Sequence, residues 1–149
     1  MQPLPRSSLF WKRWLVAVAV GVMAFGIGMV LAPGFTRQFF SMLIYSTPNH
    51  IETFGAGTVA YVSLAHAVLG AVMFGWGVAL LFIVLGPFHR GSWEAWQTLT
   101  ISVTAWFVPD TAFSLLSGFW QNAVLNLAFA VLFAVPLAAT YRECRDART

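Results

Sequence analysis

The chain has 149 residues, of which 59% are hydrophobic and 9% are charged, and its net charge is +3. Soluble domains carry about 25% charged residues, so the composition excludes an ordinary soluble domain and indicates a protein of the lipid bilayer. The basic residues lie mostly near the two ends and form no clustered face with a reading element, which excludes a nucleic-acid partner and favours membrane lipids. The only cysteine, Cys144, excludes an intramolecular disulfide.

A basic segment, residues 1–13, precedes the first apolar run at residues 14–32. The apolar core of a secretory signal peptide is about 7–15 residues long and is followed by a small-residue cleavage site. This run is longer and ends in LAPGF. We therefore predict a retained first transmembrane helix, which Pro33 and Gly34 terminate.

The longest connection, residues 35–58, divides into two halves. Its second half contains Pro48, Asn49 and two glycines and is predicted as a loop. The first half has an amphipathic pattern that is typical of a short helix lying in the membrane interface. The apolar face of that helix comprises Phe35, Phe39, Met42 and Leu43.

Residues 59–85 form the second predicted span, which carries small and polar residues at three- and four-residue spacing. Lipid gives no hydrophobic drive for helix pairing, so small residues that allow close backbone approach are expected at helix contacts. The row in this span is Ser63, His66, Gly70, Met73 and Gly77. The corresponding row in the first span is Ala17, Gly21, Ala24 and Gly28.

The third and fourth predicted spans are residues 95–117 and 122–141, and a charged tail follows at 142–149. The turn between the spans, 118–121, is so short that the two helices should be antiparallel neighbours. We predict an all-α fold, an integral membrane four-helix bundle with a short interfacial helix after span one. The bundle should form one transmembrane domain over residues 14–141.

The distribution of basic residues predicts the orientation. Only Arg37 lies in a connection assigned to the outer side. Cytoplasmic segments carry an excess of Lys and Arg, so we predict that both termini are cytoplasmic and that the chain resides in the inner (plasma) membrane. The residues behind this prediction are Arg6, Lys12, Arg13, Arg90, Arg142, Arg145 and Arg148.

A candidate site surrounds Asp110, the only acidic residue in a long apolar stretch, residues 106–126. A rise of about 1.5 Å per helical residue places Asp110 about 11 Å, His66 about 10 Å and Asn126 roughly 6 Å from the predicted outer ends of their helices. Polar groups of three helices should therefore meet in the outer leaflet. The candidate ligand-binding residues are His66, Trp106, Asp110, Ser114, Asn122 and Asn126.

A carboxylate at this depth needs hydrogen-bond donors or a cation beside it. His66, Asn122 or a serine hydroxyl can supply that partner. A purely structural alternative stays open, in which Asp110 bonds to serine hydroxyls and to backbone groups freed by Pro109. His66 is then a core residue, and Asn122 caps the fourth helix.

Several catalytic motifs are missing from the chain. It has no HExxH, no metal-binding His or Cys spacing, no glycine-rich phosphate loop and no nucleophile elbow. We therefore predict no metal site and no cofactor, and we assign no catalytic residue.

The sequence resembles the broad group of small bacterial four-helix membrane proteins called DoxX-like. Three stretches carry the resemblance: LAPGF after the first span, LGAVMFGWGVALL in the second, and WFVPDTAFSLLSG leading through NAVLN into the fourth. They cover most of residues 14–140 and are closest to uncharacterised members. The resemblance implies a fold and a topology more than an activity.

The leading functional hypothesis is a non-enzymatic membrane protein that binds a small lipophilic ligand, or a partner subunit, through the outer polar pocket. One alternative is an intramembrane enzyme, such as an isomerase of lipid-like substrates, with Asp110 and His66 as acid and base. Another is a small proton-coupled carrier, for which four spans would require a homo-oligomer.

Overall fold

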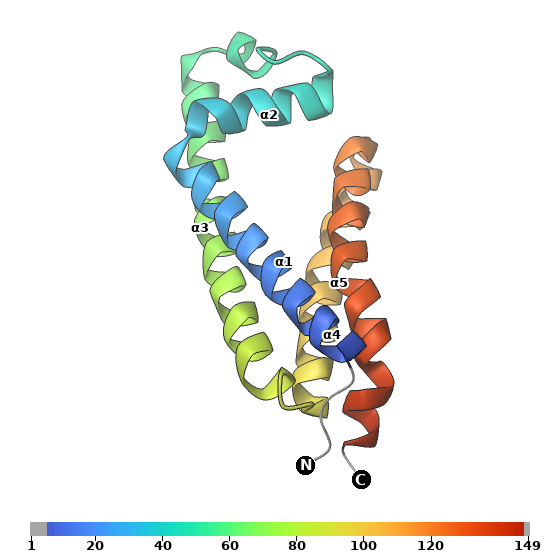
Figure 1. The fold of residues 1–149 in the computed structure, drawn as a ribbon. Helices are drawn as coiled ribbons and strands as arrows, with labels where there is room; N and C mark the ends of the chain where they lie inside the picture. The colour runs from blue at the N-terminus through green and yellow to red at the C-terminus, as the bar shows by residue number, and fades with distance from the viewer. Residues whose placement is uncertain (1–5, 148–149) are drawn as a thin grey trace. The chain divides into compact units, whose positions relative to one another are not determined.

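The computed structural model describes residues 6–147, with side chains from Leu9 onward, and the regular secondary structure of this part of the chain is all helical (Figure 1). The prediction of an all-α fold with a short helix after the first span is confirmed. The elements are α1 (Arg6–Leu31), α2 (Pro33–Tyr45), η1 (Ile51–Phe54), α3 (Ala56–Ile83), η2 (Val84–Phe88), α4 (Trp93–Leu116) and α5 (Trp120–Asp146). The first five residues of the predicted basic segment, and Arg148 and Thr149 of the predicted tail, lie outside the described residues.

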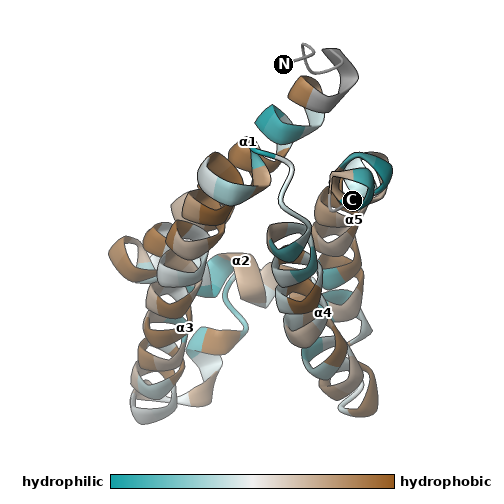
Figure 2. Cartoon of the chain, turned by 90° about the horizontal axis from the view of Figure 1, so that it is seen from below, coloured by the Kyte–Doolittle hydropathy of each residue, from teal (hydrophilic) through white to brown (hydrophobic). Residues whose placement is uncertain are grey.

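Four of the helices, α1, α3, α4 and α5, are long and apolar enough to cross a membrane. In Figure 2, α3 is brown over most of its length, whereas hydrophilic teal gathers at the end of α5 beside the C-terminus. The chain is therefore a multi-pass integral membrane protein, and the exposed apolar side chains along these helices contact lipid. The helix α5 continues to Asp146 and so includes five of the eight residues predicted as a tail.

The described residues form two compact units. One comprises residues 21–77, and the other comprises residues 78–147 together with the first part of α1, up to Val20. The single transmembrane domain proposed over residues 14–141 stays a prediction.

In the second of these units, α4 and α5 form an antiparallel hairpin. The hydroxyl of Ser92 caps the start of α4 by accepting a hydrogen bond from the backbone N–H of Ala95 at 3.1 Å. Gly118, with φ of +81°, provides the left-handed residue that ends the helix and reverses the chain. The indole N–H of Trp96 donates to the carbonyl of Leu137 at 2.8 Å and ties the two helices together near their other end.

A proline in α5 provides a second attachment point. Pro136 has no N–H, so the carbonyl of Leu132, four residues earlier, loses its normal helical donor. The indole N–H of Trp14 donates to this carbonyl at 3.0 Å. Trp14 therefore satisfies a backbone group that the proline leaves open.

Lys12 is almost completely buried, with 1% of its surface exposed. Its ammonium group donates to the carboxylate of Glu143 at 2.6 Å and to the carbonyl of His89 at 3.1 Å. The start of α1, the connection before α4 and the end of α5 therefore meet at one charge. Burying an ammonium group costs free energy unless it is paired and hydrogen-bonded, and here it is both.

In the unit formed by residues 21–77, α2 lies across the end of α1 rather than continuing it (Figure 1). Pro33 occupies the first turn of α2, where its missing N–H leaves no helical bond unmade. The hydroxyl of Ser41 closes the loop that follows, because it donates to the carbonyl of Thr47 at 2.6 Å and accepts from the N–H of His50 at 2.9 Å.

The backbones of α1 and α3 touch at one pair of glycines in this unit. A methyl group added to Gly26 would lie 2.6 Å from the carbonyl oxygen of Gly70, and one added to Gly70 would lie 2.5 Å from that of Gly26. Gly70 belongs to the predicted row of small residues in α3. The row of small residues predicted to form the contact in α1 was wrong, because Cβ atoms at its members Gly21 and Gly28 would meet no atom within 4 Å.

This contact predicts a sharp difference between glycines. Gly26→Ala and Gly70→Ala should each destabilise the protein by about 1–3 kcal/mol, because the added methyl groups would meet rigid backbone atoms. Gly21→Ala and Gly28→Ala are the matched controls, and they should be neutral or stabilising by up to about 1 kcal/mol through helix propensity. Thermal unfolding in mild detergent measures all four, and equal midpoints across the set would contradict the assigned contact.

Candidate functional site

Asp110 lies in a polar cluster at the turn of the α4–α5 hairpin. One amide group, that of Asn122, donates to the carboxylate of Asp110 at 3.1 Å and to the hydroxyl of Ser114 at 2.8 Å. The Ser114 hydroxyl donates in turn to the backbone carbonyl of Asp110 at 2.8 Å. Asp110 and Ser114 are four residues apart in α4 and share a face, and Asn122 reaches them from the first turn of α5.

A second polar contact lies one helical turn further along the hairpin. Asn126 is 3% exposed, and its amide lies 3.4 Å from the hydroxyl of Thr111, which is a long hydrogen bond. Asn122 and Asn126 thus face α4 as a pair. Thr111 had not been predicted, although its place beside Asp110 and opposite Asn126 in an antiparallel hairpin could have indicated it.

The indole ring of Trp106 lies 6.3 Å from the ring of Phe107, edge to face, and the residue has further contacts of its own. Its predicted role in the Asp110 cluster stays a prediction. Of the six candidate residues, the structure joins Asp110, Ser114 and Asn122 directly and places Asn126 one turn away.

His66 belongs to the unit formed by residues 21–77 and has different neighbours. Its ring stacks on that of Phe40 in α2, with centroids 4.7 Å apart and an interplanar angle of 17°. Its Nδ1 atom is buried and has no hydrogen-bond partner among the described residues. The pairing of His66 with Asp110 stays a prediction.

The same unit contains an apolar cavity of about 170 Å³ between the second half of α1 and α2. The only lining residue with a polar side chain is Thr36, whose hydroxyl donates to the carbonyl of Ala32 at 3.1 Å. Phe35 is 70% exposed, so the wall reaches the protein surface. The cavity is lined by Ala24, Phe25, Gly28, Met29, Ala32, Phe35, Thr36, Phe39 and Phe40. No polar residue marked this cavity in the sequence.

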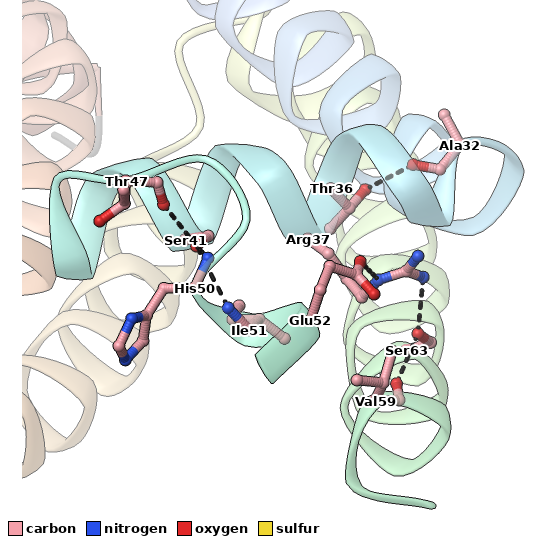
Figure 3. A network of polar contacts seen from close by, with 10 residues as sticks. All are labelled: Ala32, Thr36, Arg37, Ser41, Thr47, His50, Ile51, Glu52, Val59 and Ser63. Atoms are coloured by element: carbon pink, nitrogen blue, oxygen red, sulfur yellow. Dashed lines mark hydrogen bonds and ion pairs between the residues drawn. The ribbon is translucent and has the colours of Figure 1, made fainter. Parts of the chain in front are cut away.

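Arg37, next to Thr36 in α2, connects three elements of this unit (Figure 3). Its guanidinium donates to the carboxylate of Glu52 in the η1 segment at 2.8 Å and to the hydroxyl of Ser63 in α3 at 2.9 Å. The Ser63 hydroxyl donates to the carbonyl of Val59 at 2.7 Å, so it is saturated as a donor. Arg37 therefore links α2 both to η1 and to α3.

Across residues 9–147, no three His, Cys, Asp or Glu side chains come close enough together to hold an ion.

These observations define a class, that of small multi-pass integral membrane proteins with four candidate spans. No family model, no curated protein and no solved structure matches the chain. The DoxX-like resemblance therefore stays a prediction.

The Asp110 cluster leads to a test of its structural role. Asn122→Leu should destabilise the protein by about 1–2 kcal/mol, the range for interhelical hydrogen bonds in membranes, because Asp110 and Ser114 both lose their amide partner. Gln97→Leu, at an exposed position of α4, is the control and should change stability by less than about 0.5 kcal/mol. Unfolding midpoints in detergent measure both, and a stable Asn122→Leu variant would argue against a role in helix pairing.

Proposed function

We propose that this membrane protein binds a lipophilic molecule, whose hydrocarbon part occupies the cavity between α1 and α2. The observation that carries this proposal is the lining, in which eight of nine side chains are apolar and the single hydroxyl already has an acceptor. A polar or charged group placed there would lose its hydrogen bonds to water without replacement.

The size of the cavity supports a hydrocarbon occupant. Apolar cavities of about 150 Å³ remain dry and bind small hydrocarbons such as benzene. The cavity here is slightly larger, at about 170 Å³, and its wall includes the exposed Phe35. Since lipid surrounds the spans, acyl chains or lipophilic molecules dissolved in the bilayer are the molecules that reach it.

The polar cluster of α4 and α5 has a structural role in this proposal. Asp110, Ser114 and Asn122 use one another as hydrogen-bond partners, which supports helix pairing rather than ligand capture. Acid–base catalysis by Asp110 and His66 would require both groups within hydrogen-bond reach of one substrate. Asp110 bonds to Asn122 and the ring of His66 stacks on Phe40, and neither contact provides such an arrangement.

We also propose the orientation with both termini in the cytoplasm of a cell whose inner membrane holds the protein. The positive-inside rule supports it, because seven of the eight basic residues fall in the segments assigned to that side. It would put α2 in the outer interface, with the cavity in the outer leaflet.

Filling the cavity tests the proposed function. A Cβ at Gly28 meets no atom within 4 Å, and Gly28 lines the cavity, so Gly28→Leu can extend into it. We expect this variant to fold. Its labelling by a photoreactive alkane should decrease by a factor of about ten or more, which corresponds to a loss of about 1.4 kcal/mol in binding free energy. Gly21→Leu, where the added Cβ also meets open space, does not line the cavity and should label like the wild type. Equal labelling of both variants would contradict the proposal.

A second test addresses the orientation. Asn49 is exposed in the loop after α2, so an Asn49→Cys variant should react with a membrane-impermeant thiol reagent in intact cells. The natural Cys144 is completely buried and should give little background. Labelling of Asn49→Cys only after the cells are opened would reverse the proposed orientation.

A further inference from the structure

Phe40 lies between the apolar cavity and His66. It lines the cavity between α1 and α2, and its ring stacks on His66 of α3 at a centroid distance of 4.7 Å. One aromatic side chain therefore belongs both to the wall of an apolar cavity and to the immediate surroundings of an imidazole.

The imidazole carries an unexplained polar atom. Nδ1 of His66 is buried and has no hydrogen-bond partner within residues 6–147. Buried polar side-chain atoms in native proteins nearly always have a partner, so such an exception calls for a physical explanation.

The neighbours of His66 along α3 do not supply that partner. Ser63, one turn before it, donates its proton to the carbonyl of Val59 and accepts from Arg37. Gly70, one turn after it, has no side chain and packs against the backbone of Gly26. Since no described residue bonds to Nδ1, a molecule that enters this region can supply the missing partner.

We propose that the ligand is an uncharged amphiphile with a hydroxyl group, and that this hydroxyl hydrogen-bonds to His66 when the Phe40 ring turns aside. The inference rests on the proposed function, since the hydrocarbon part of the same molecule fills the cavity. Rotamer changes of single side chains are common when partners bind, and Phe40 is the residue that lies next to both the cavity and the imidazole.

The chemistry of the site selects the head group. The cation of this region, Arg37, is already paired with the carboxylate of Glu52 and bonded to Ser63. A charged head buried beside the rings of Phe40 and His66 would therefore be far more costly than a neutral hydrogen-bonding group. A hydroxyl can both donate and accept, so it satisfies Nδ1 in either tautomer of the neutral imidazole. A carbonyl oxygen can only accept and would fit one tautomer alone.

Two photoreactive probes with the same hydrocarbon chain test the inference in the purified full-length protein. One is a long-chain alcohol, and the other is the alkane that ends in a methyl group. The wild type should label more strongly with the alcohol, by about threefold to tenfold, the worth of one hydrogen bond. His66→Phe keeps an aromatic ring for stacking on Phe40 and should label equally with both probes.

The outcomes separate the two proposals. If Gly28→Leu reduces labelling by neither probe, the cavity does not bind the hydrocarbon chain and the proposed function fails. If the wild type labels equally with both probes in a Gly28-dependent way, the cavity stands and the hydroxyl inference is overturned. Loss of both labels in folded His66→Phe would also overturn it, because the residue would then only shape the wall.

A measurement on the wild type covers the case in which His66→Phe does not fold. The ¹⁵N resonances of the His66 imidazole should shift when the alcohol is added and stay unchanged with the alkane. The resonances of His50 and His89, which are exposed, serve as internal controls. Unchanged His66 resonances with the alcohol would overturn the inference.

Discussion

A helix in a bilayer gains little from exchanging lipid for another apolar helix, because the acyl chains are as apolar as leucine. Every helix contact in this chain therefore needs another source of stability. In the unit formed by residues 21–77, two glycines allow the backbones of α1 and α3 to touch, at Gly26 and Gly70. In the other unit the sources are polar: amide and hydroxyl bonds between α4 and α5, and a buried ammonium at Lys12.

The same constraint explains why a polar cluster within a span need not mark a ligand site. An amide or carboxylate in a span must find partners, and the nearest available ones lie on the neighbouring helix. Asp110, Ser114 and Asn122 satisfy one another in this way. The cavity between α1 and α2 contains almost no polar group, and a site of that kind leaves no chemical signature in the sequence.

The number and order of the five α-helices could be predicted, because long apolar runs and proline or glycine breaks depend only on local sequence. The short helix η1, in contrast, lies in a segment that was predicted as a loop. The grouping of Asp110 with Ser114 and Asn122 could also be predicted from the sequence, since helical spacing and a short turn leave few other arrangements. The choice of Gly26 over Gly21 and Gly28 could not be predicted, because it depends on how α1 is rotated about its axis toward α3. The pairing of Lys12 with Glu143 could not be predicted either, because the two residues lie 131 positions apart in the chain.

The hydrogen bond from Trp14 to Leu132 has a consequence for the alignment of α1 and α5. Along an uninterrupted helix every interior carbonyl already accepts a bond, so an indole N–H would meet equivalent, occupied acceptors at each step. Pro136 leaves the carbonyl of Leu132 without its helical donor, and the Trp14 indole supplies a bond that this carbonyl lacks, whereas at other levels an indole could only add a second bond, as that of Trp96 does at Leu137. A proline in one helix thus favours one register of another, because sliding the start of α1 by a single turn along α5 would leave the Leu132 carbonyl without this donor.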